Sequence, residues 1–207
     1  EAESVRAYVV GLREREAPLS ASSTARVISS IRGYTRFLLE EGVLTSDPAE
    51  SLAVPKQPRR LPKALSHAQV EALLAATDGD DAVRVRDKAL LELLYATGAR
   101  VSEAVALDVD DLVGADGTPE LIRVVGKGNK ERIVPFGRAA GNLLRRYLAD
   151  IRPELVRHEN ETTLFLSRNG KRLDREWIWR IVKDAARIAG IDKNIHPHTL
   201  RHSFASH

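Results

Sequence analysis

The chain has 207 residues, of which 43% are hydrophobic and 29% are charged. This balance is typical of a folded globular protein and excludes a disordered polyampholyte, and no apolar run approaches the roughly eighteen residues of a membrane-spanning helix. Cysteine is absent, which excludes disulfides, thiolate nucleophiles and Cys-ligated metal sites. We therefore expect a cytoplasmic protein with one large domain or two small ones.

Charge is nearly balanced overall but segregated along the chain. Lys and Arg together number 32 against 29 for Asp and Glu. Residues 55–70 carry bases and no acid, residues 121–147 carry seven bases against the single Glu131, and residues 101–120 carry six acids and no base. Such segregation can build a positive face that follows a polyanion, although solvated helix faces would give the same pattern.

The first third of the chain predicts a helical lobe and a linker. Residues 2–15 favour a helix, and a longer helix with an apolar stripe is expected from Ser20 to Gly42. Asp47-Pro48 is typical of the start of a short helix. Residues 54–64, VPKQPRRLPKA, interleave prolines with basic residues, which is typical of a linker between domains.

After the linker the sequence predicts a mostly helical domain with one β-hairpin. Ser66 and Gln69 form a capping-box pattern at the start of a helix. LIRVV at 121–125 and ERIVPF at 131–136 alternate like strands and are joined by the glycine-rich turn GKGNK. The fold class is therefore α+β. A short strand is expected at TLFLS, 163–167, and helices are expected at 66–77, 82–97, 101–107, 139–151, 174–190 and from about 197 onward.

Arg100 lies just past the helix-stopping Gly98, at the start of the next predicted helix. Free backbone N–H groups and the helix dipole favour an anion at this place. The guanidinium fork could bind a phosphate or a carboxylate, with Glu103 one turn later to orient it. A surface ion pair between Arg100 and Glu103 would explain the same residues.

Lys127 is predicted at the tip of the hairpin, between Gly126 and Gly128. Glycines let the backbone approach a ligand closely, so this lysine could contact phosphates. It could also act as a general acid if basic neighbours such as Lys130 and Arg132 lower its pKa. An ordinary hairpin turn with no chemical role fits the same sequence.

The segment HPHTLRH places His198, Arg201 and His202 on one face of a helix. Zinc binding by the two histidines is disfavoured, because an arginine lies between them and the Glu of H-E-x-x-H is absent. A structural histidine cluster is one alternative. The other is phosphate chemistry, in which Arg201 binds the oxygens while His198 donates a hydrogen bond or moves a proton.

Three segments resemble, in order, the motif regions of the tyrosine recombinase (phage integrase) family, most closely its Xer-type members: ATGARVSEAVAL, VVGKGNKERIVPF and HPHTLRHSFASH. The resemblance implies a SAM-like helical DNA-binding domain at 1–53, a basic linker at 54–64 and a catalytic domain at 65–207. It implies catalytic roles for Arg100, Lys127, His198 and Arg201, a supporting role for Glu103, and DNA contacts by Lys56, Arg59, Arg60, Lys130 and Arg132.

The activity implied by the resemblance is site-specific DNA recombination. A tyrosine attacks a DNA phosphate, a 3′-phosphotyrosyl intermediate forms, and the strand is rejoined without metal or cofactor. The partners are double-stranded DNA and further recombinase subunits, in a tetramer of this chain with itself or with a paralogue. Chromosome dimer resolution is the expected cellular role.

The sequence departs from the family in one respect. The nucleophilic tyrosine of the family follows H-x-x-R, whereas Tyr8, Tyr34, Tyr95 and Tyr147 all precede it. With no initiator methionine either, we expect a fragment that is truncated at both ends and inactive alone. The alternatives are a non-catalytic DNA-binding relative and a helix-turn-helix regulator built on residues 82–107, against which the acidic run after residue 107 counts.

Overall fold

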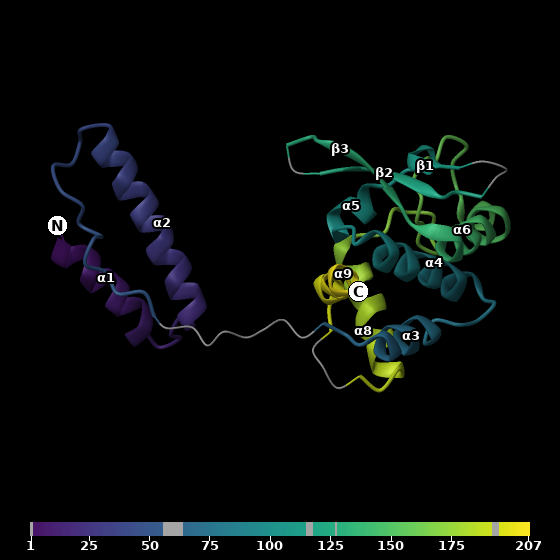
Figure 1. Cartoon of the computed structure of the whole chain (residues 1–207), viewed down its shortest axis with the longest axis horizontal. Coiled ribbons are helices and arrows are strands. Elements are labelled where there is room, and N and C mark those ends of the chain that lie inside the picture. Colours follow the sequence, from purple (N-terminus) through teal and green to yellow (C-terminus); the bar gives the residue numbers. More distant parts are fainter. Residues whose placement is uncertain (1, 56–63, 115–117, 127, 192–194) are drawn as a thin grey trace. The chain divides into compact units, whose positions relative to one another are not determined.

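The computed structural model describes residues 2–55, 64–114, 118–126, 128–191 and 195–207. The chain divides into two compact units, residues 1–61 and 62–207 (Figure 1). The predicted linker at 54–64 lies largely outside the described residues, so its limits and the domain boundaries stay predictions. No described helix is both long and apolar enough to cross a membrane.

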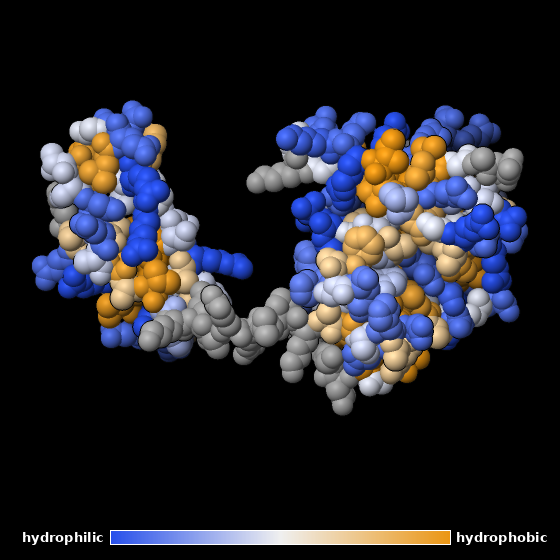
Figure 2. Space-filling model, in the orientation of Figure 1, coloured by the Kyte–Doolittle hydropathy of each residue, from blue (hydrophilic) through white to orange (hydrophobic). Residues whose placement is uncertain are grey.

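Unit 1 consists of α1 (Ala2–Glu14) and α2 (Ala21–Glu40), followed by turns. The Ser20 hydroxyl begins α2 by accepting the N–H of Ser23 at 3.1 Å. The buried core of this unit is small, and the expected apolar stripe of α2 is only partly inside it. Tyr34 and Phe37 are 62% and 53% exposed, and Figure 2 shows hydrophobic areas on the surface of this unit. The buried apolar cluster consists of Val9, Ile28, Ala49 and Leu52.

The short helix predicted at Asp47-Pro48 is wrong, because these residues form a turn. The Asp47 carboxylate accepts the N–H of Ala49 at 2.8 Å, as an N-cap would. The Glu50 and Leu52 N–H groups donate to carbonyls three residues earlier, at Asp47 and Ala49, so the segment forms tight turns and not an α-helix.

In unit 2 the helix α4 (Ala82–Thr97) runs through the core. It begins at Asp81, whose carboxylate accepts two backbone N–H groups, and it ends at Gly98 in the left-handed conformation. Its neighbours are α6 (Gly137–Arg146) and α9 (Pro197–Ser206). The predicted capping box of Ser66 and Gln69 is confirmed at the start of α3 (His67–Ala75), which packs against α8 (Arg175–Ile188).

The sheet of unit 2 is antiparallel, in the order β1 (Leu112–Val113), β2 (Leu121–Val125), β3 (Glu131–Pro135). The predicted hairpin is confirmed, and Val124 pairs with Arg132 across it. Val124 is buried, whereas Ile133 on the outer face is 63% exposed, and Figure 2 shows apolar side chains over the sheet. The helix α5 (Val101–Ala106) packs against β2. The unpredicted strand β1 has two residues, too few for a periodic pattern.

Two predictions after the hairpin need correction. The helix expected at 139–151 is α6 followed by a wider π-helical turn, η2 (Tyr147–Ile151), and then by α7 (Arg152–Leu155). The strand expected at 163–167 is absent from the described sheet, and the segment makes only isolated bridges. Residues 163–166 are all buried, and their backbone groups bond separate parts of the chain. The Leu164 N–H donates to the Leu107 carbonyl, the Phe165 carbonyl accepts from Leu173, and the Tyr147 hydroxyl bonds the Leu164 carbonyl and the Leu166 N–H.

Candidate active site

The turn between α4 and α5 places Arg100 at a helix N-terminus. Gly98 has φ +56°, and a Cβ there would lie 2.5 Å from the Phe204 ring of α9, so this tight corner requires glycine. Arg100 is the residue before α5, and its backbone N–H donates to the Glu103 carboxylate at 2.8 Å. The Arg100 side chain is 50% exposed and therefore accessible to a ligand.

Glu103 is the buried centre of an ion-pair network. Its side chain is 3% exposed and bonds Arg100 Nη1 at 2.8 Å through Oε1. Arg132 of β3 donates to both carboxylate oxygens, at 3.0 Å and 2.8 Å. Burial alone would raise the pKa of Glu103, but the hydrogen bonds from Arg132 and Arg100 outweigh it and lower that pKa to about 2. Glu103 is therefore ionised at neutral pH and ties the hairpin to the start of α5.

The helix α9 presents the second group of predicted residues. Leu200 and Ser203 are buried, whereas His198 is exposed and Arg201 is partly buried. The Ser203 hydroxyl accepts the Leu65 N–H at 2.9 Å and so fixes the helix to the start of the unit. An Arg201 Nη1 donates to the carbonyl of Gly98. Arg201 thus reaches the α4–α5 corner from a position more than one hundred residues later in the chain.

A cleft of about 380 Å³ lies between α9, the α4–α5 corner and β3. The described residues that line it carry two guanidinium groups and two imidazoles, and none of them is acidic. They are Thr97, Gly98, Arg132, Val134, His198, Arg201, His202, Phe204 and Ala205. Arg100 is not among them, but it is joined to the lining residue Arg132 through Glu103. This arrangement can hold an anion by converging positive charge.

Several predicted residues cannot be placed in this cleft. Lys127, Lys56, Arg59 and Arg60 lie outside the described residues. Lys130 is exposed at the base of the hairpin turn. His198 and His202 both line the cleft, but the described part of the chain holds no cluster of three or more His, Asp or Glu side chains suited to a metal ion.

No tyrosine is among the described residues that line the cleft. The Tyr147 hydroxyl is buried and bonded to the backbone, and the Tyr95 hydroxyl bonds His207 Nδ1 at 2.8 Å. Tyr8 and Tyr34 belong to unit 1. The residues that the structure describes therefore place no tyrosine nucleophile in the cleft.

Two features of the site were not predicted from the sequence. The first is the ion pair between Arg132 and Glu103. Arg132 was expected only to contact DNA, and because the two residues are 29 positions apart, no local sequence pattern predicts their pairing. His196 lies before α9, with its ring 5.3 Å from Trp179 and 6.0 Å from His198, centroid to centroid. Burial, followed by the nearby charge of His198, lowers the pKa of His196.

The helix α8 carries a second basic surface. Its residues Arg175, Glu176, Trp179, Arg180 and Lys183 line a shallow hollow of about 450 Å³. The Lys183 ammonium lies 5.7 Å from the Trp179 ring, and the Arg180 guanidinium lies 5.4 Å from the ring of the neighbouring Trp177. Exposed cations interleaved with aromatic rings are typical of nucleic-acid contacts.

Comparison with known proteins identifies two family regions. Residues 63–207 match the phage integrase family, and residues 1–42 match the N-terminal SAM-like domain of phage integrases. Tyrosine recombinase XerD of Halalkalibacterium halodurans is 42% identical over 205 residues, covering 99% of this chain and 67% of the relative. XerD of Pseudomonas putida is 46% identical over 185 residues, covering 89% and 61%. The chain thus spans about two thirds of these relatives.

Solved structures show the same fold. The XerH site-specific recombinase bound to its palindromic difH substrate matches with a TM-score of 0.74 at 25% identity, covering 99% of this chain and 59% of that one. The XerA recombinase matches with a TM-score of 0.61 at 29% identity, covering 99% and 68%. Both matches extend over the two units described above. The chain belongs to the phage integrase family of tyrosine recombinases.

Proposed function

We propose that this chain is the DNA-binding and phosphate-activating part of an Xer-type site-specific recombinase. The observation that carries the proposal is the cleft in which Arg201, Arg132 and His198 converge beside Arg100. Phosphoryl transfer is catalysed mainly by positioning and by neutralising charge on the phosphate oxygens, and this is what such a set of side chains supplies.

In the proposed reaction a tyrosine hydroxyl loses its proton to solvent, its oxygen attacks the scissile phosphorus, and the bond to the 5′ oxygen breaks. Arg100 and Arg201 neutralise the non-bridging oxygens, while His198 donates a hydrogen bond to one of them. Lys127 gives the proton that the departing 5′ oxygen takes up, a role that rests on the family resemblance. The phosphotyrosyl bond keeps the energy of the broken ester, so the reverse reaction rejoins a strand without a cofactor.

The tyrosine is proposed to come from outside residues 1–207, because none of the described cleft residues is a tyrosine. We also propose, from the family resemblance, that the chain binds double-stranded DNA and forms a tetramer with itself or with a paralogue. The domain limits 1–53, 54–64 and 65–207 and a role in chromosome dimer resolution belong to the same proposal. Phosphate contacts are assigned to Lys56, Arg59, Arg60, Lys130 and Arg132.

The basic face of α8 fits the same function. Its cations and aromatic rings are exposed, so they can lie against the DNA backbone and base edges. A helix-turn-helix regulator fits less well, because α5 has six residues and buries Val101, Glu103 and Ala104. A recognition helix must instead present side chains to the major groove.

The test uses a nicked suicide duplex that traps a covalent protein–DNA adduct. The 207-residue chain should form no adduct, whereas the extended chain, continued by its own reading frame through a tyrosine beyond residue 207, should form one. Arg201→Lys in the extended chain should lower adduct formation by about 100-fold, because a bidentate phosphate contact is lost. Arg84→Lys is the control, since Arg84 is 52% exposed and pairs with Asp81 at the start of α4, the end of that helix away from the cleft.

Each result decides between the candidates. An adduct on the unextended chain would contradict the proposed origin of the nucleophile. An extended chain that binds DNA but never forms an adduct would favour the alternative, a non-catalytic DNA-binding relative. That alternative is kept because no tyrosine is among the described cleft residues.

A further inference from the structure

The hydrogen-bonding positions of the Glu103 carboxylate are shared between two arginines from different elements. Oε1 accepts from Arg100 at 2.8 Å and from Arg132 at 3.0 Å, and Oε2 accepts from the Arg100 backbone N–H and from Arg132, both at 2.8 Å. We infer that Arg132 is a positioning residue that satisfies most of the hydrogen-bonding capacity of Glu103, so that Arg100 needs only its Nη1 for Glu103 and can offer its other donors to the DNA phosphate. This inference rests on the proposed function and adds to the direct DNA contact assigned to Arg132.

Charge and burial give the reason. A carboxylate that is 3% exposed cannot rely on water and must be paired by the protein. With Arg132 present, the three side chains carry a net charge of +1. Without it, Arg100 would be the one guanidinium left to Glu103 among its described partners, and the pair would be neutral. An arginine that must neutralise a buried carboxylate alone attracts a phosphate less strongly.

The fold brings Arg132 to this place through the alternation of β3. Arg132 lies on the inner face, opposite the buried Val124, and it lines the cleft. The neighbouring Ile133 points to the opposite face. This inner position explains why two N–H groups of Arg132, which is 37% exposed, donate to the Glu103 carboxylate and not to solvent.

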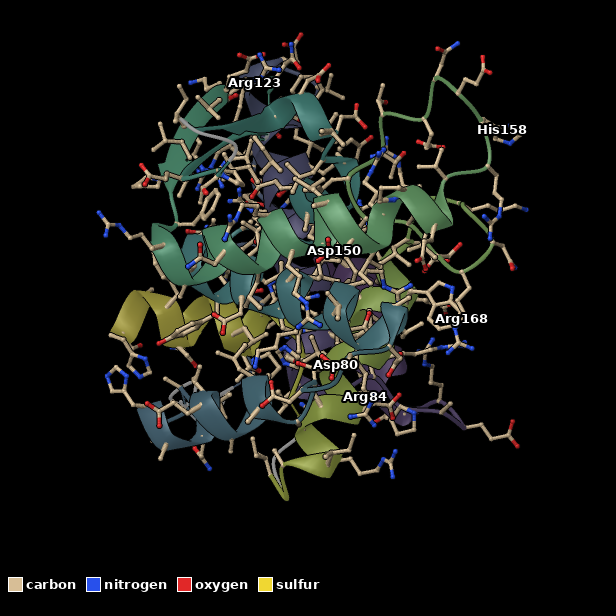
Figure 3. The ribbon with its side chains drawn as sticks, turned by 90° about the vertical axis from the view of Figure 1, so that its right-hand side faces the viewer. Asp80, Arg84, Arg123, Asp150, His158 and Arg168 are labelled. Atoms are coloured by element: carbon tan, nitrogen blue, oxygen red, sulfur yellow. The ribbon has the colours of Figure 1, made fainter. Side chains whose placement is uncertain are left out.

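The sheet also offers a matched control. Arg123 of β2 pairs with Asp111 at 3.1 Å and is 45% exposed, similar to Arg132. It lies on the outer face of the central strand, paired with Ile133, and Figure 3 shows it at the end of the unit where the sheet lies. Arg123→Met therefore removes a strand arginine with an acidic partner but leaves the Glu103 network intact.

The experiment follows the Nε–H NMR signals of Arg100 and Arg201 while the 207-residue chain is titrated with inorganic phosphate. In the unchanged chain both signals should shift. Arg132→Met should weaken the apparent phosphate affinity at Arg100 by about tenfold, as expected for the loss of charge-assisted hydrogen bonds, and should weaken it less at Arg201. Arg132→Lys should be intermediate, because it keeps the charge but loses the two-pronged contact. Arg123→Met should change neither signal.

The decisive measurement is a double-mutant cycle with Glu103→Gln. If Arg132 acts through Glu103, neutralising Glu103 removes the negative charge that Arg100 would otherwise have to balance alone. The double variant Glu103→Gln, Arg132→Met should then recover most of the phosphate affinity measured at Arg100. Additive losses would overturn the inference and leave Arg132 as a simple phosphate contact. The same cycle on single-turnover cleavage by the extended chain should show the loss mainly in the rate constant and not in DNA affinity.

The inference and the proposed function fail in different ways. If phosphate shifts neither Arg100 nor Arg201 in the unchanged chain, the cleft is not a phosphate site and both fail. If phosphate shifts both signals and Arg132→Met alters neither, the proposed function stands and the inference is wrong. Thermal denaturation of each variant separates these results from unfolding, and Arg132→Lys provides a second variant if Arg132→Met does not fold.

Discussion

At the residue scale, the properties of the site depend on one buried carboxylate. Glu103 holds a backbone N–H and two guanidinium groups, and those interactions keep it ionised although burial opposes the charge. Removing one partner leaves the buried carboxylate charge uncompensated. The resulting loss of folding free energy is larger than the net stabilisation that the intact hydrogen bond contributes. Glu103 therefore contributes to stability and to site geometry together.

The first prediction concerns the pH dependence of stability. Glu103 has a folded-state pKa of about 2, below its usual value near 4.5, so its contribution is complete above pH 4.5 and is lost as the pH falls toward 2. Glu103→Gln should destabilise unit 2 by on the order of 3 kcal/mol at pH 7, and by progressively less below pH 4.5. Urea unfolding of both proteins between pH 3 and 7 measures the difference, and a constant difference would contradict it.

The second prediction concerns Gly98. Alanine there would adopt a left-handed conformation that costs about 1 kcal/mol, and its Cβ would meet the Phe204 ring at 2.5 Å. Gly98→Ala should therefore lower the free energy of unfolding of unit 2 by about 2 kcal/mol or more, measured by urea unfolding. Gly33→Ala in α2 is the control, because its Cβ meets nothing within 4 Å and a helical alanine should stabilise by about 0.5–1 kcal/mol. Equal effects at both positions would refute the argument.

At the element scale, helices with clear end signals were predicted well. The helix α4 spans the predicted residues Ala82–Thr97 and ends at Gly98, and α8 begins after its N-cap Asp174, as expected. Prediction failed where tertiary contacts replace local pattern. The TLFLS segment has strand composition, but its hydrogen bonds go to the Leu107 carbonyl, to residues 171–173 and to the Tyr147 hydroxyl, and not to one neighbouring strand. No pattern within the segment itself indicates that these groups take the place of a strand partner.

The predicted site residues divide in the same way. Motif spacing identified Arg100, His198 and Arg201, and the structure places the last two in one cleft with the first beside it. Their roles remain predictions. The link from Arg132 to Glu103 could not be predicted from spacing, because it depends on which face of β3 points inward. Strand alternation suggests two faces, but only packing decides which one meets α5.

The third prediction concerns the exposed face of α8. Lys183→Gln removes one cation beside Trp179, so the slope of log affinity against log salt for duplex DNA should decrease by about one. Trp179→Ala should weaken binding by about 1 kcal/mol or more and leave that slope unchanged, because an apolar contact with the sugar–phosphate backbone releases no counterion. Fluorescence anisotropy of a labelled duplex at several salt concentrations measures both. Unchanged binding in both variants would show that α8 does not meet DNA.

At the scale of the whole molecule, the two units have separate hydrophobic cores of very different size. The cluster in unit 2 extends from Leu65 to Leu200, whereas the one in unit 1 has four buried members among the residues that the structure describes. Stability grows with the apolar area that folding removes from water, so unit 1 should be the less stable of the two. Its exposed Tyr34 and Phe37 add little to that core.

The last prediction tests this difference through one side chain. Ile28 is 1% exposed and is the most deeply buried large side chain of the small core, so Ile28→Ala should cost about 2–4 kcal/mol and unfold unit 1 at 25 °C. Limited proteolysis should then cut within residues 1–61, while the NMR signals of Arg100 and Arg201 in unit 2 stay unchanged. Leu73→Ala, at a fully buried position of unit 2, should lower the melting temperature of that unit and leave unit 1 resistant. If Ile28→Ala instead broadened the Arg100 and Arg201 signals, folding of the cleft would depend on unit 1, and the two cores would have to be treated as one cooperative system.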